Sequence, residues 1–306
     1  MSWAEVVKRG IKKEESDKPM EVLTTKVEKP VKVLPHPYLI DIGSNLTSSK
    51  FKHCLEDVIK RARVAHVKKQ IITGGNLAES INAQKLAHHY PGEFYSTAGI
   101  HPHHAKEFNS ETVEELEKLL QHPEVVAVGE TGLDYFRNLS KPEMQKQSFK
   151  AHIELAIKHN MPLFLHERDA HEDFMEVFKE VLYKKQLKWE DLPPVVVHCF
   201  TGKAKHLDKY ISIGFYVGIT GYIAINGRGE HLHRCLPDKV PLDRLMIETD
   251  APYMRPSQAP RLASGQNEPC NLGYVAETLA KIYHVDRNVI WKATTQNAEK
   301  FFGITK

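Results

Sequence analysis

Four titratable side chains follow short apolar runs of the sequence. Glu130 comes after V-A-V-G, His166 after L-F-L, His198 after V-V-V and Asp250 after M-I-E-T. A carboxylate or imidazole at the end of a buried strand loses water and needs a charged, hydrogen-bonding or metal partner. Imidazoles and carboxylates without thiolates are typical of sites for Mg²⁺, Mn²⁺ or Zn²⁺ that keep open coordination positions. Such ions activate water and neutralise charge on a phosphoryl oxygen.

Three further residues could bind a substrate beside that set. His101 and His103 follow the apolar run that ends at residue 100, and for His103 contact with substrate and simple solvent exposure are equally expected. Arg168 lies two residues beyond His166. Its guanidinium could hold a phosphate group through its fork of donors.

Two acids could have either a structural or a functional role. Asp134 could bind substrate, or it could orient a ligand histidine from outside the metal centre. Glu248 could be an inner acid paired with a base. If the last strand continues to Asp250, alternation places Glu248 and Asp250 on the same side of it.

The elements that must position these residues repeat from residue 38 onward. Eight segments resemble strands buried on both faces: 39–43, 70–75, 95–100, 125–130, 162–166, 195–198, 215–220 and 245–250. Helix-like stretches follow them at 50–66, 77–90, 110–121, 142–160, 171–186, 203–213, 228–236 and 272–284, and 286–302 closes the chain. Eight strand–helix units predict one TIM (β/α)8 barrel over residues 38–306. The loops after its strands would bring the candidate residues to one rim.

The first 37 residues have a different character. They are rich in charge, contain four prolines and show no sustained period, so we expect a disordered extension that could bind a partner protein. They hold eight Lys/Arg and six Asp/Glu, which leaves 34 and 33 for the remainder, so the barrel is nearly neutral. Any nucleic-acid binding must therefore use a local patch.

Composition also excludes several classes of protein. No apolar run approaches the length of a membrane span, and the N-terminus lacks the apolar core of a signal peptide, so a cytoplasmic or nuclear protein is expected. The four cysteines are scattered without a C-x-x-C pair, which predicts reduced thiols and neither a zinc finger nor a disulfide framework. We expect a monomer.

A series of ordered motifs resembles the TatD family of metal-dependent deoxyribonucleases between about residues 39 and 303. The motifs are I-D-I-G-S-N-L at 40–46, G-I-H-P-H at 99–103, V-G-E-T-G-L-D-Y at 128–135, H-E-R-D-A-H at 166–171, V-H-C-F-T-G at 197–202, I-E-T-D-A-P-Y at 247–253 and N-E-P at 267–269. The resemblance implies a TIM barrel in which Glu130, His166 and His198 bind a divalent ion. Asp250 would serve at the same centre as a ligand or base.

The first strand departs from the pattern of many family members. They have Asp-x-His-x-His there, whereas Asp41 is followed by Gly43 and Asn45 at the two histidine positions. The subgroup whose first strand reads D-I-G-x-N-L shares this departure. It leaves one firm site anchored by Glu130, with any second ion relying on Glu130, Asp250 and the substrate. Glu167, where cysteine often follows the strand-five histidine, is expected to add an acid near the rim.

The resemblance implies a nuclease that uses Mg²⁺, or alternatively Mn²⁺ or Zn²⁺. Its activity would be 3′→5′ exonucleolytic on single-stranded or nicked DNA, in DNA repair or in DNA degradation during cell death. In this reading Glu130 and Asp250 are catalytic, and Asn45, His101, His103 and Arg168 contact the substrate. Two alternatives stay open: a small-molecule amidohydrolase on the same rim, favoured by the near-neutral barrel, and a non-catalytic scaffold acting through residues 1–37.

Overall fold

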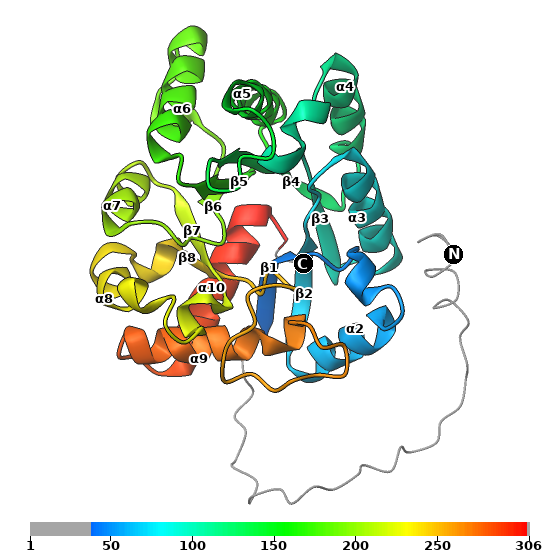
Figure 1. Ribbon diagram of the computed structural model, residues 1–306, viewed down its shortest axis with the longest axis vertical. Helices are drawn as coiled ribbons and strands as arrows, with labels where there is room; N and C mark the ends of the chain where they lie inside the picture. The colour runs from blue at the N-terminus through cyan, green and yellow to red at the C-terminus, as the bar shows by residue number, and fades with distance from the viewer. Residues whose placement is uncertain (1–37, 305–306) are drawn as a thin grey trace, which may run out of the picture.

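The computed structural model describes residues 38–304 and consists of eight parallel strands in sequential order (Figure 1). The strands are β1 (Leu39–Ser44), β2 (Val67–Ile72), β3 (Phe94–Ala98), β4 (Val125–Asp134), β5 (Leu163–Arg168), β6 (Val195–Val197), β7 (Tyr216–Ile219) and β8 (Leu245–Ile247). A parallel bridge between Ser44 and Ala251 brings the ends of the sheet together. The predicted TIM barrel is confirmed.

All of the described helices except the last one surround the barrel (Figure 1). They are α2 (Leu55–Val64), α3 (Leu77–His89), α4 (Ser110–Leu119), α5 (Pro142–His159), α6 (His171–Lys185), α7 (Ala204–Ser212), α8 (Glu230–Lys239), α9 (Leu272–Ile282) and α10 (Arg287–Phe302). The helix expected over 50–66 is divided, because a short 3₁₀ turn at Ser49–Phe51 precedes α2. The helix expected to begin at Ser110 does so, although Asn109 provides its cap by accepting from Thr112 N–H.

Strand alternation divides the apolar core into two layers. Side chains such as Ile42, Phe164, Val196 and Met246 fill the barrel interior and pack with Phe301 at the end of α10. Their neighbours on the same strands face the surrounding helices, among them Leu163, Leu165, Val195 and Val197 on β5 and β6. In Figure 1, α10 (red) is seen through the ring formed by the strands, and its residues Phe301 and Phe302 pack against the inner layer. The residues beyond the inner layer on β5 and β6 are His166 and His198, so alternation directs both rings into the barrel mouth.

Two boundaries differ from the sequence-based prediction and affect the site. Strand β4 does not end at Glu130 but continues to Asp134. Strand β8 ends at Ile247, before Glu248 and Asp250, and Asp250 adopts a left-handed backbone with φ of 50°. The prediction that strand alternation places Glu248 and Asp250 on the same side therefore does not apply, because both residues lie beyond the end of β8.

Other expectations have mixed outcomes. The four cysteines are free thiols, as the sequence predicted. Within residues 38–304, no helix combines the length and apolar character needed to cross a bilayer. The extension proposed for residues 1–37 lies outside the described part of the chain.

Candidate active site at the barrel rim

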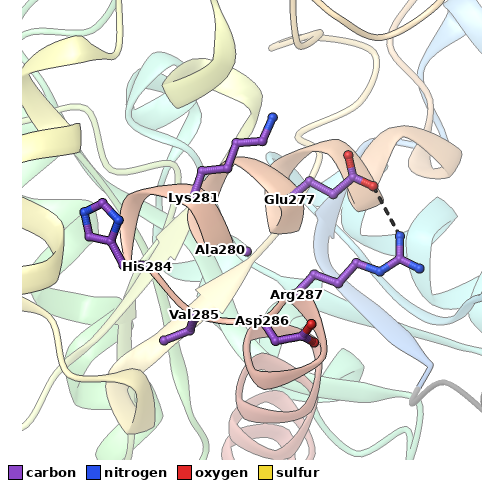
Figure 2. Close-up of a pocket in the computed structure, with 7 residues that line it drawn as sticks. All are labelled: Glu277, Ala280, Lys281, His284, Val285, Asp286 and Arg287. Carbon is purple, nitrogen blue, oxygen red and sulfur yellow. Dashed lines mark ion pairs between the residues drawn. The ribbon is translucent and has the colours of Figure 1, made fainter.

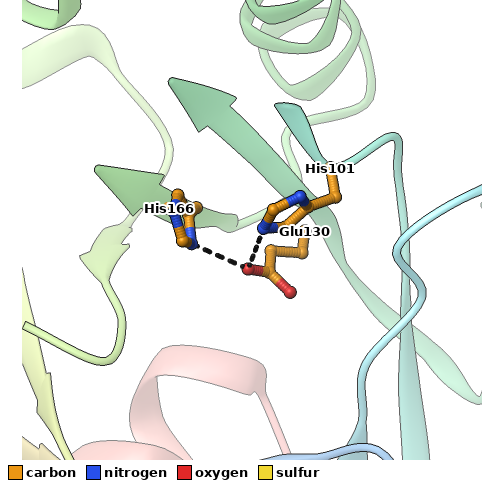
Figure 3. Close-up of side chains that lie close together, drawn as sticks. All are labelled: His101, Glu130 and His166. Carbon is orange, nitrogen blue, oxygen red and sulfur yellow. Dashed lines mark hydrogen bonds and ion pairs between the residues drawn. The ribbon is translucent and has the colours of Figure 1, made fainter. Parts of the chain in front are cut away.

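Glu130 is the centre of a group of imidazoles at the barrel mouth. Its Oε1 lies 2.8 Å from His198 Nε2, 3.1 Å from His166 Nδ1 and 3.2 Å from His101 Nε2. Figure 3 shows the His101 and His166 rings approaching this oxygen; His101 follows β3 and His166 is on β5, so the two rings come from the strands on either side of β4. Glu130 is 8% exposed, so its charge is stabilised mainly by these rings and very little by water.

The backbone of β4 explains how Glu130 reaches this position. The pairing of β4 with β5 steps from Val128–Leu163 to Thr131–Leu165, which inserts one extra residue into β4. Such a bulge redirects the side chain beside it. Gly129 and Gly132 flank the bulge with φ of 146° and 136°. A Cβ on either would lie within about 2 Å of a β5 carbonyl oxygen, so only glycine fits.

The proton of His101 can be assigned from its hydrogen bonds. The main-chain N–H of His103 donates to His101 Nδ1 at 3.0 Å, so Nδ1 is an acceptor and the ring proton lies on Nε2. That Nε2 faces Glu130 Oε1. Burial lowers the pKa of His101 to about 4, despite the opposing charge of Glu130. His101 is therefore a neutral hydrogen-bond donor in this arrangement.

Asp134 links two of the predicted histidines. Its Oδ2 lies 2.9 Å from His103 Nε2 and 3.2 Å from His166 Nε2, and the carboxylate is 1% exposed. His166 is consequently held through both ring nitrogens, by Glu130 on one side and Asp134 on the other. This is the orienting role that the sequence allowed for Asp134. His103 contacts this acid and is not among the rings on Glu130.

Glu248 plays the same part for His198. His198 Nδ1 lies 3.2 Å from Glu248 Oε2 while its Nε2 faces Glu130, and Glu248 is fully buried. A Cβ at Gly43 would lie 2.2 Å from that same Glu248 oxygen. The Glu248 carboxylate thus occupies the space that a side chain at position 43 would need. A histidine at position 43, as in many family members, would not fit beside Glu248 in this arrangement.

Electrostatics reinforces this group. Burial raises the pKa of Glu130, but the charge of His198 and the hydrogen bonds from His101 and His166 outweigh burial and bring that pKa well below its usual value. Burial lowers the pKa of His198, yet Glu130 and Glu248 raise it well above the ordinary value. Burial also lowers the pKa of His166, but its hydrogen bonds to Asp134 and Glu130 outweigh burial and raise that pKa above its ordinary value. The centre is a network of ionised acids and bound imidazoles.

Asp250 joins this network from the β1 side. Asn45 Nδ2 donates to Asp250 Oδ1 at 3.0 Å. Burial raises the pKa of Asp250 to about 7, with His198 lowering it and Glu130 raising it. Among the described residues, no hydrogen bond or ion pair joins Asp250 to Glu130, His166 or His198. It is coupled to them through space and is a carboxyl group that can exchange a proton near neutral pH.

The donor set suits a divalent cation. One carboxylate oxygen and two imidazole nitrogens, from Glu130, His101 and His166, lie within 4.8 Å of one another. The proton on His101 Nε2 makes that ring a poor ligand as it stands, while His198 contacts the same Glu130 oxygen. Nitrogen and oxygen donors without thiolate, backed by Asp134 and Glu248, match the chemistry of open Mn²⁺, Zn²⁺ or Mg²⁺ sites.

Exposed aromatic residues near the rim were missed by the sequence-based prediction. Phe136 is 61% exposed, and the guanidinium of Arg168 lies 3.9 Å from its ring centre. Tyr253 is 51% exposed, with the Lys50 ammonium 4.8 Å from its ring centre. Their positions in the sequence could have identified them, because Phe136 directly follows G-L-D-Y and Tyr253 ends the D-A-P-Y motif. Each is an aromatic face paired with a cation.

The expectation for Glu167 is wrong. It does not add an acid to the open rim, because alternation on β5 directs it away from His166 to the outer face, where it is buried. There it accepts from the Tyr210 hydroxyl at 2.9 Å and from Ala170 N–H at 2.9 Å. It therefore does not repel a polyanion at the barrel mouth.

An open pocket of about 640 Å³ lies elsewhere, where α9 leads into α10 (Figure 2). It is lined by Glu277, Ala280, Lys281, His284, Val285, Asp286 and Arg287. Arg287 and Glu277 form an ion pair of 3.5 Å across it. None of the barrel-rim residues contributes, and the pocket lacks the converging acids and imidazoles that chemistry requires.

The fold and this rim define a class of protein, the barrel hydrolases whose site is built from imidazoles and carboxylates at strand ends. The family model described as TatD related DNase matches residues 40–303. The chain belongs to this family.

Individual relatives agree with the family model. The chain is 43% identical over 265 residues to the 3′-5′ ssDNA/RNA exonuclease TatD of Erwinia billingiae, which covers 86% of this chain and 98% of that protein. Among solved structures it is similar to a TatD family hydrolase from Entamoeba histolytica, with a TM-score of 0.77, 25% identity and coverage of 88% and 99%. It is also similar to the TatD homolog YJJV from Escherichia coli K12, with a TM-score of 0.76, 26% identity and coverage of 87% and 98%.

Proposed function

We propose that this protein is a divalent-metal-dependent nuclease that hydrolyses phosphodiester bonds of DNA, acting as a 3′→5′ exonuclease on single-stranded or nicked ends. The observation that carries the proposal is the group on Glu130 Oε1, where three imidazole nitrogens lie within 3.2 Å at the barrel mouth. Family membership supports the reaction class, and the relative from Erwinia is named for 3′-5′ cleavage of single-stranded DNA and RNA.

Glu130, His166 and His198 would hold the cation, with Asp250 as a further oxygen donor or as a base. Asp134 and Glu248 fix the orientation of the two ligand rings from behind. A bound divalent cation neutralises charge on a phosphoryl oxygen and lowers the pKa of water. We propose Mg²⁺ as the physiological cation, with Mn²⁺ and Zn²⁺ as alternatives that the imidazole donors accept readily.

Asp250 would accept the proton of the attacking water. A general base works best when its pKa lies near the working pH, and burial brings the pKa of Asp250 to about 7. Asn45 donates to Oδ1, so the proton would go to Oδ2, whose neighbour is the weakly donating Cys199 thiol at 4.0 Å. His101 would donate its Nε2 proton to an oxygen of the scissile phosphate, since its other nitrogen already accepts from the backbone.

The exposed aromatic residues would bind the strand. Bases of a single strand stack on aromatic faces regardless of sequence, and adjacent cations contact the phosphates. Phe136 with Arg168 and Tyr253 with Lys50 provide both groups next to the catalytic residues. A local patch of this kind explains how a nearly neutral barrel could bind a polyanion. His103, held by Asp134, would line the path of the strand.

The test is release of nucleotides from 3′-labelled single-stranded DNA and RNA, with Mg²⁺ and with chelator. We expect activity that depends on the metal and falls at least about 1,000-fold in Glu130→Ala and His198→Ala. The surface variant Glu154→Ala is the matched control. Full activity in chelator, or in both site variants, would contradict the assignment of the centre.

The amidohydrolase alternative shares the rim and is separated from the nuclease by its substrates. Turnover of amides or lactones without any DNA or RNA cleavage would favour it. A cytoplasmic or nuclear location, monomeric state and protein binding through residues 1–37 complete the proposal. Gel filtration and deletion of that segment test the last two.

A further inference from the structure

A second group of metal-ligating side chains lies outside the barrel, between β5 and the helices α6 and α7. Glu167 shares the outward face of β5 with Leu163 and Leu165. His171 is the first residue of α6, and His206 lies in the first turn of α7. Glu167 and His206 are both at least nine-tenths buried. The three residues therefore join one strand and two helices.

The geometry of this group resembles that of a ligand set. One donor atom from each of Glu167, His171 and His206 lies within 4.8 Å of the other two. The imidazole rings of His171 and His206 stack with centres 3.9 Å apart and planes inclined by 3°. Two protonated rings in that arrangement would repel each other strongly, so the stack favours rings that keep a nitrogen lone pair.

One buried atom in the group lacks a hydrogen bond. Among residues 38–304, His206 Nδ1 has no hydrogen-bond partner, and it lies 3.9 Å from Glu167 Oε2, too far for such a bond. A buried nitrogen without a partner is unfavourable, and groups of this kind in folded proteins usually have a ligand or an ion. The free nitrogen points toward the acid that a cation would share.

Tyr210 supports the other two members. Its hydroxyl donates to Glu167 Oε2 at 2.9 Å, and His171 Nδ1 lies 2.9 Å from the same hydroxyl oxygen. The hydroxyl proton is used on Glu167, so His171 Nδ1 must be the donor in the second bond. This assignment leaves a lone pair on His171 Nε2. A ligand histidine whose other nitrogen donates to a polar partner is the usual arrangement around a bound metal.

We propose that Glu167, His171 and His206 form a zinc site that links β5 to α6 and α7. Two imidazoles and one carboxylate are a ligand set found for Zn²⁺, with water in the fourth position. The two rings are stacked face to face, so binding would require them to rotate until their in-plane lone pairs converge and the donor atoms come to about 3.4 Å from one another. The site is distinct from the Glu130 centre, since Glu167 and His166 face opposite sides of β5. It does not depend on the proposed nuclease activity.

The first test counts zinc in the full chain. Protein stripped with chelator is equilibrated with Zn²⁺, freed of excess metal by gel filtration and analysed by mass spectrometry. In the Glu130→Ala/His198→Ala background, about one equivalent is expected to remain with roughly micromolar affinity or tighter. Adding His171→Ala and His206→Ala should remove it, whereas adding His53→Ala, an exposed histidine, should not. Equal zinc in both additions would overturn the proposal.

A second measurement covers the case in which the multiple variants do not fold. In the otherwise unaltered chain, His206→Gln should bind about one zinc fewer than wild type and His53→Ala should bind the same amount as wild type. Co²⁺ substitution should give wild type the visible absorption of tetrahedral cobalt, reduced in His206→Gln. Unchanged zinc content and an unchanged cobalt spectrum in His206→Gln would show that the group is only a hydrogen-bond network.

Discussion

The main-chain N–H of His103 donates to Nδ1 of His101 at 3.0 Å, and this bond decides what His101 can do. It places the ring proton on Nε2, which faces Glu130 Oε1 at 3.2 Å. A neutral imidazole with its proton directed at the centre is a hydrogen-bond donor and cannot ligate a cation through that atom. His101 and His166 are equally close to Glu130, yet they differ in the role available to them.

This difference can be measured by substituting each ring separately. His101→Ala should retain the metal affinity of wild type and lose about 100-fold or more in kcat, because it removes a donor to the transition state. His166→Ala should lose both metal affinity and activity. Titration with Mn²⁺ and nuclease assays at saturating metal separate the two effects. Equal loss of metal affinity in the two variants would identify His101 as a ligand.

Glu248 should act through His198. Replacing it by glutamine leaves the size of the side chain unchanged but removes the charge that faces His198 Nδ1 at 3.2 Å. Loss of such an outer partner typically weakens metal binding by about 10- to 100-fold. The expected result is a higher Mn²⁺ concentration for half-maximal activity with kcat largely restored at saturation. Glu154→Gln, on the surface of α5, should behave as wild type.

The exposed aromatic residues should affect binding of the strand more than chemistry. Phe136→Ala and Tyr253→Ala each remove one stacking face, worth about 1–3 kcal/mol per base. The corresponding rise in KM for single-stranded DNA is roughly 5- to 150-fold, with little change in kcat. Tyr183→Ala is the matched control because Tyr183 is 88% exposed on α6. Unaltered KM in both rim variants would exclude the stacking role.

Asn45 should set the pH at which Asp250 works. Its donation to Asp250 Oδ1 lowers the pKa of a carboxyl group that burial raises to about 7. Asn45→Ala removes the bond, so the pKa of Asp250 should rise and the acid limb of the kcat profile should move to higher pH. The profile of Asn45→Asp is uninformative because it adds a charge, so Asn45→Ser, which keeps a donor, is the comparison. An acid limb that stays in place would contradict a base role for Asp250.

The sequence alone predicts the barrel because the pattern of a short apolar strand followed by a helix is clear in each of its eight repeats. Leu163–Leu165 and Val195–Val197 are short runs with no polar face, and in the structure both faces of these strands are buried. The placement of Glu130 near His166 and His198 follows from parallel strands ending at one rim. These features depend on local pattern and on topology, which the chain order fixes.

Details that depend on backbone irregularity could not be predicted in this way. The extra residue in β4 continues the strand to Asp134 and lets that acid reach both His103 and His166. The left-handed conformation at Asp250 ends the alternation assumed for the last strand. Glu167 was expected at the rim because it is next to His166 in the sequence. Alternation along a strand, however, directs neighbouring side chains to opposite faces, which places Glu167 on the outer face.

Finally, the buried acids predict how stability depends on pH. Burial raises the pKa of Asp41 to about 8, although its bonds from Thr249 oppose this, and that of Asp250 to about 7. Between pH 4 and these values the folded chain holds protons that the unfolded chain has released. Its free energy of unfolding must therefore fall as pH rises, by at most about 1.4 kcal/mol per pH unit for each group.

Two imidazoles, those of His166 and His198, act in the same direction as these acids at higher pH. The raised pKa values of His166 and His198 contribute stability that is present below about pH 6.5 and is lost as pH rises through the folded values. Glu130, whose pKa is lowered, acts only below about pH 4.5 and lies outside this window. Above about pH 6.5, metal-free protein should therefore lose stability as the pH rises to 8. Below that pH, His101, His152 and His206 oppose this trend, because burial lowers the pKa of each to about 4.

Asp41→Asn isolates one part of this dependence. The amide keeps an oxygen for Thr249 N–H and can donate to the Thr249 hydroxyl, so the fold should be retained while the titration is lost. Urea unfolding in chelator at about pH 6.5 to 8 should then give a shallower slope than wild type, by up to about 1.4 kcal/mol per pH unit. Asp238→Asn, at an exposed position on α8, should keep the wild-type slope. If Asp41→Asn also keeps it, Asp41 is ionised in the folded protein and its two bonds from Thr249 outweigh burial.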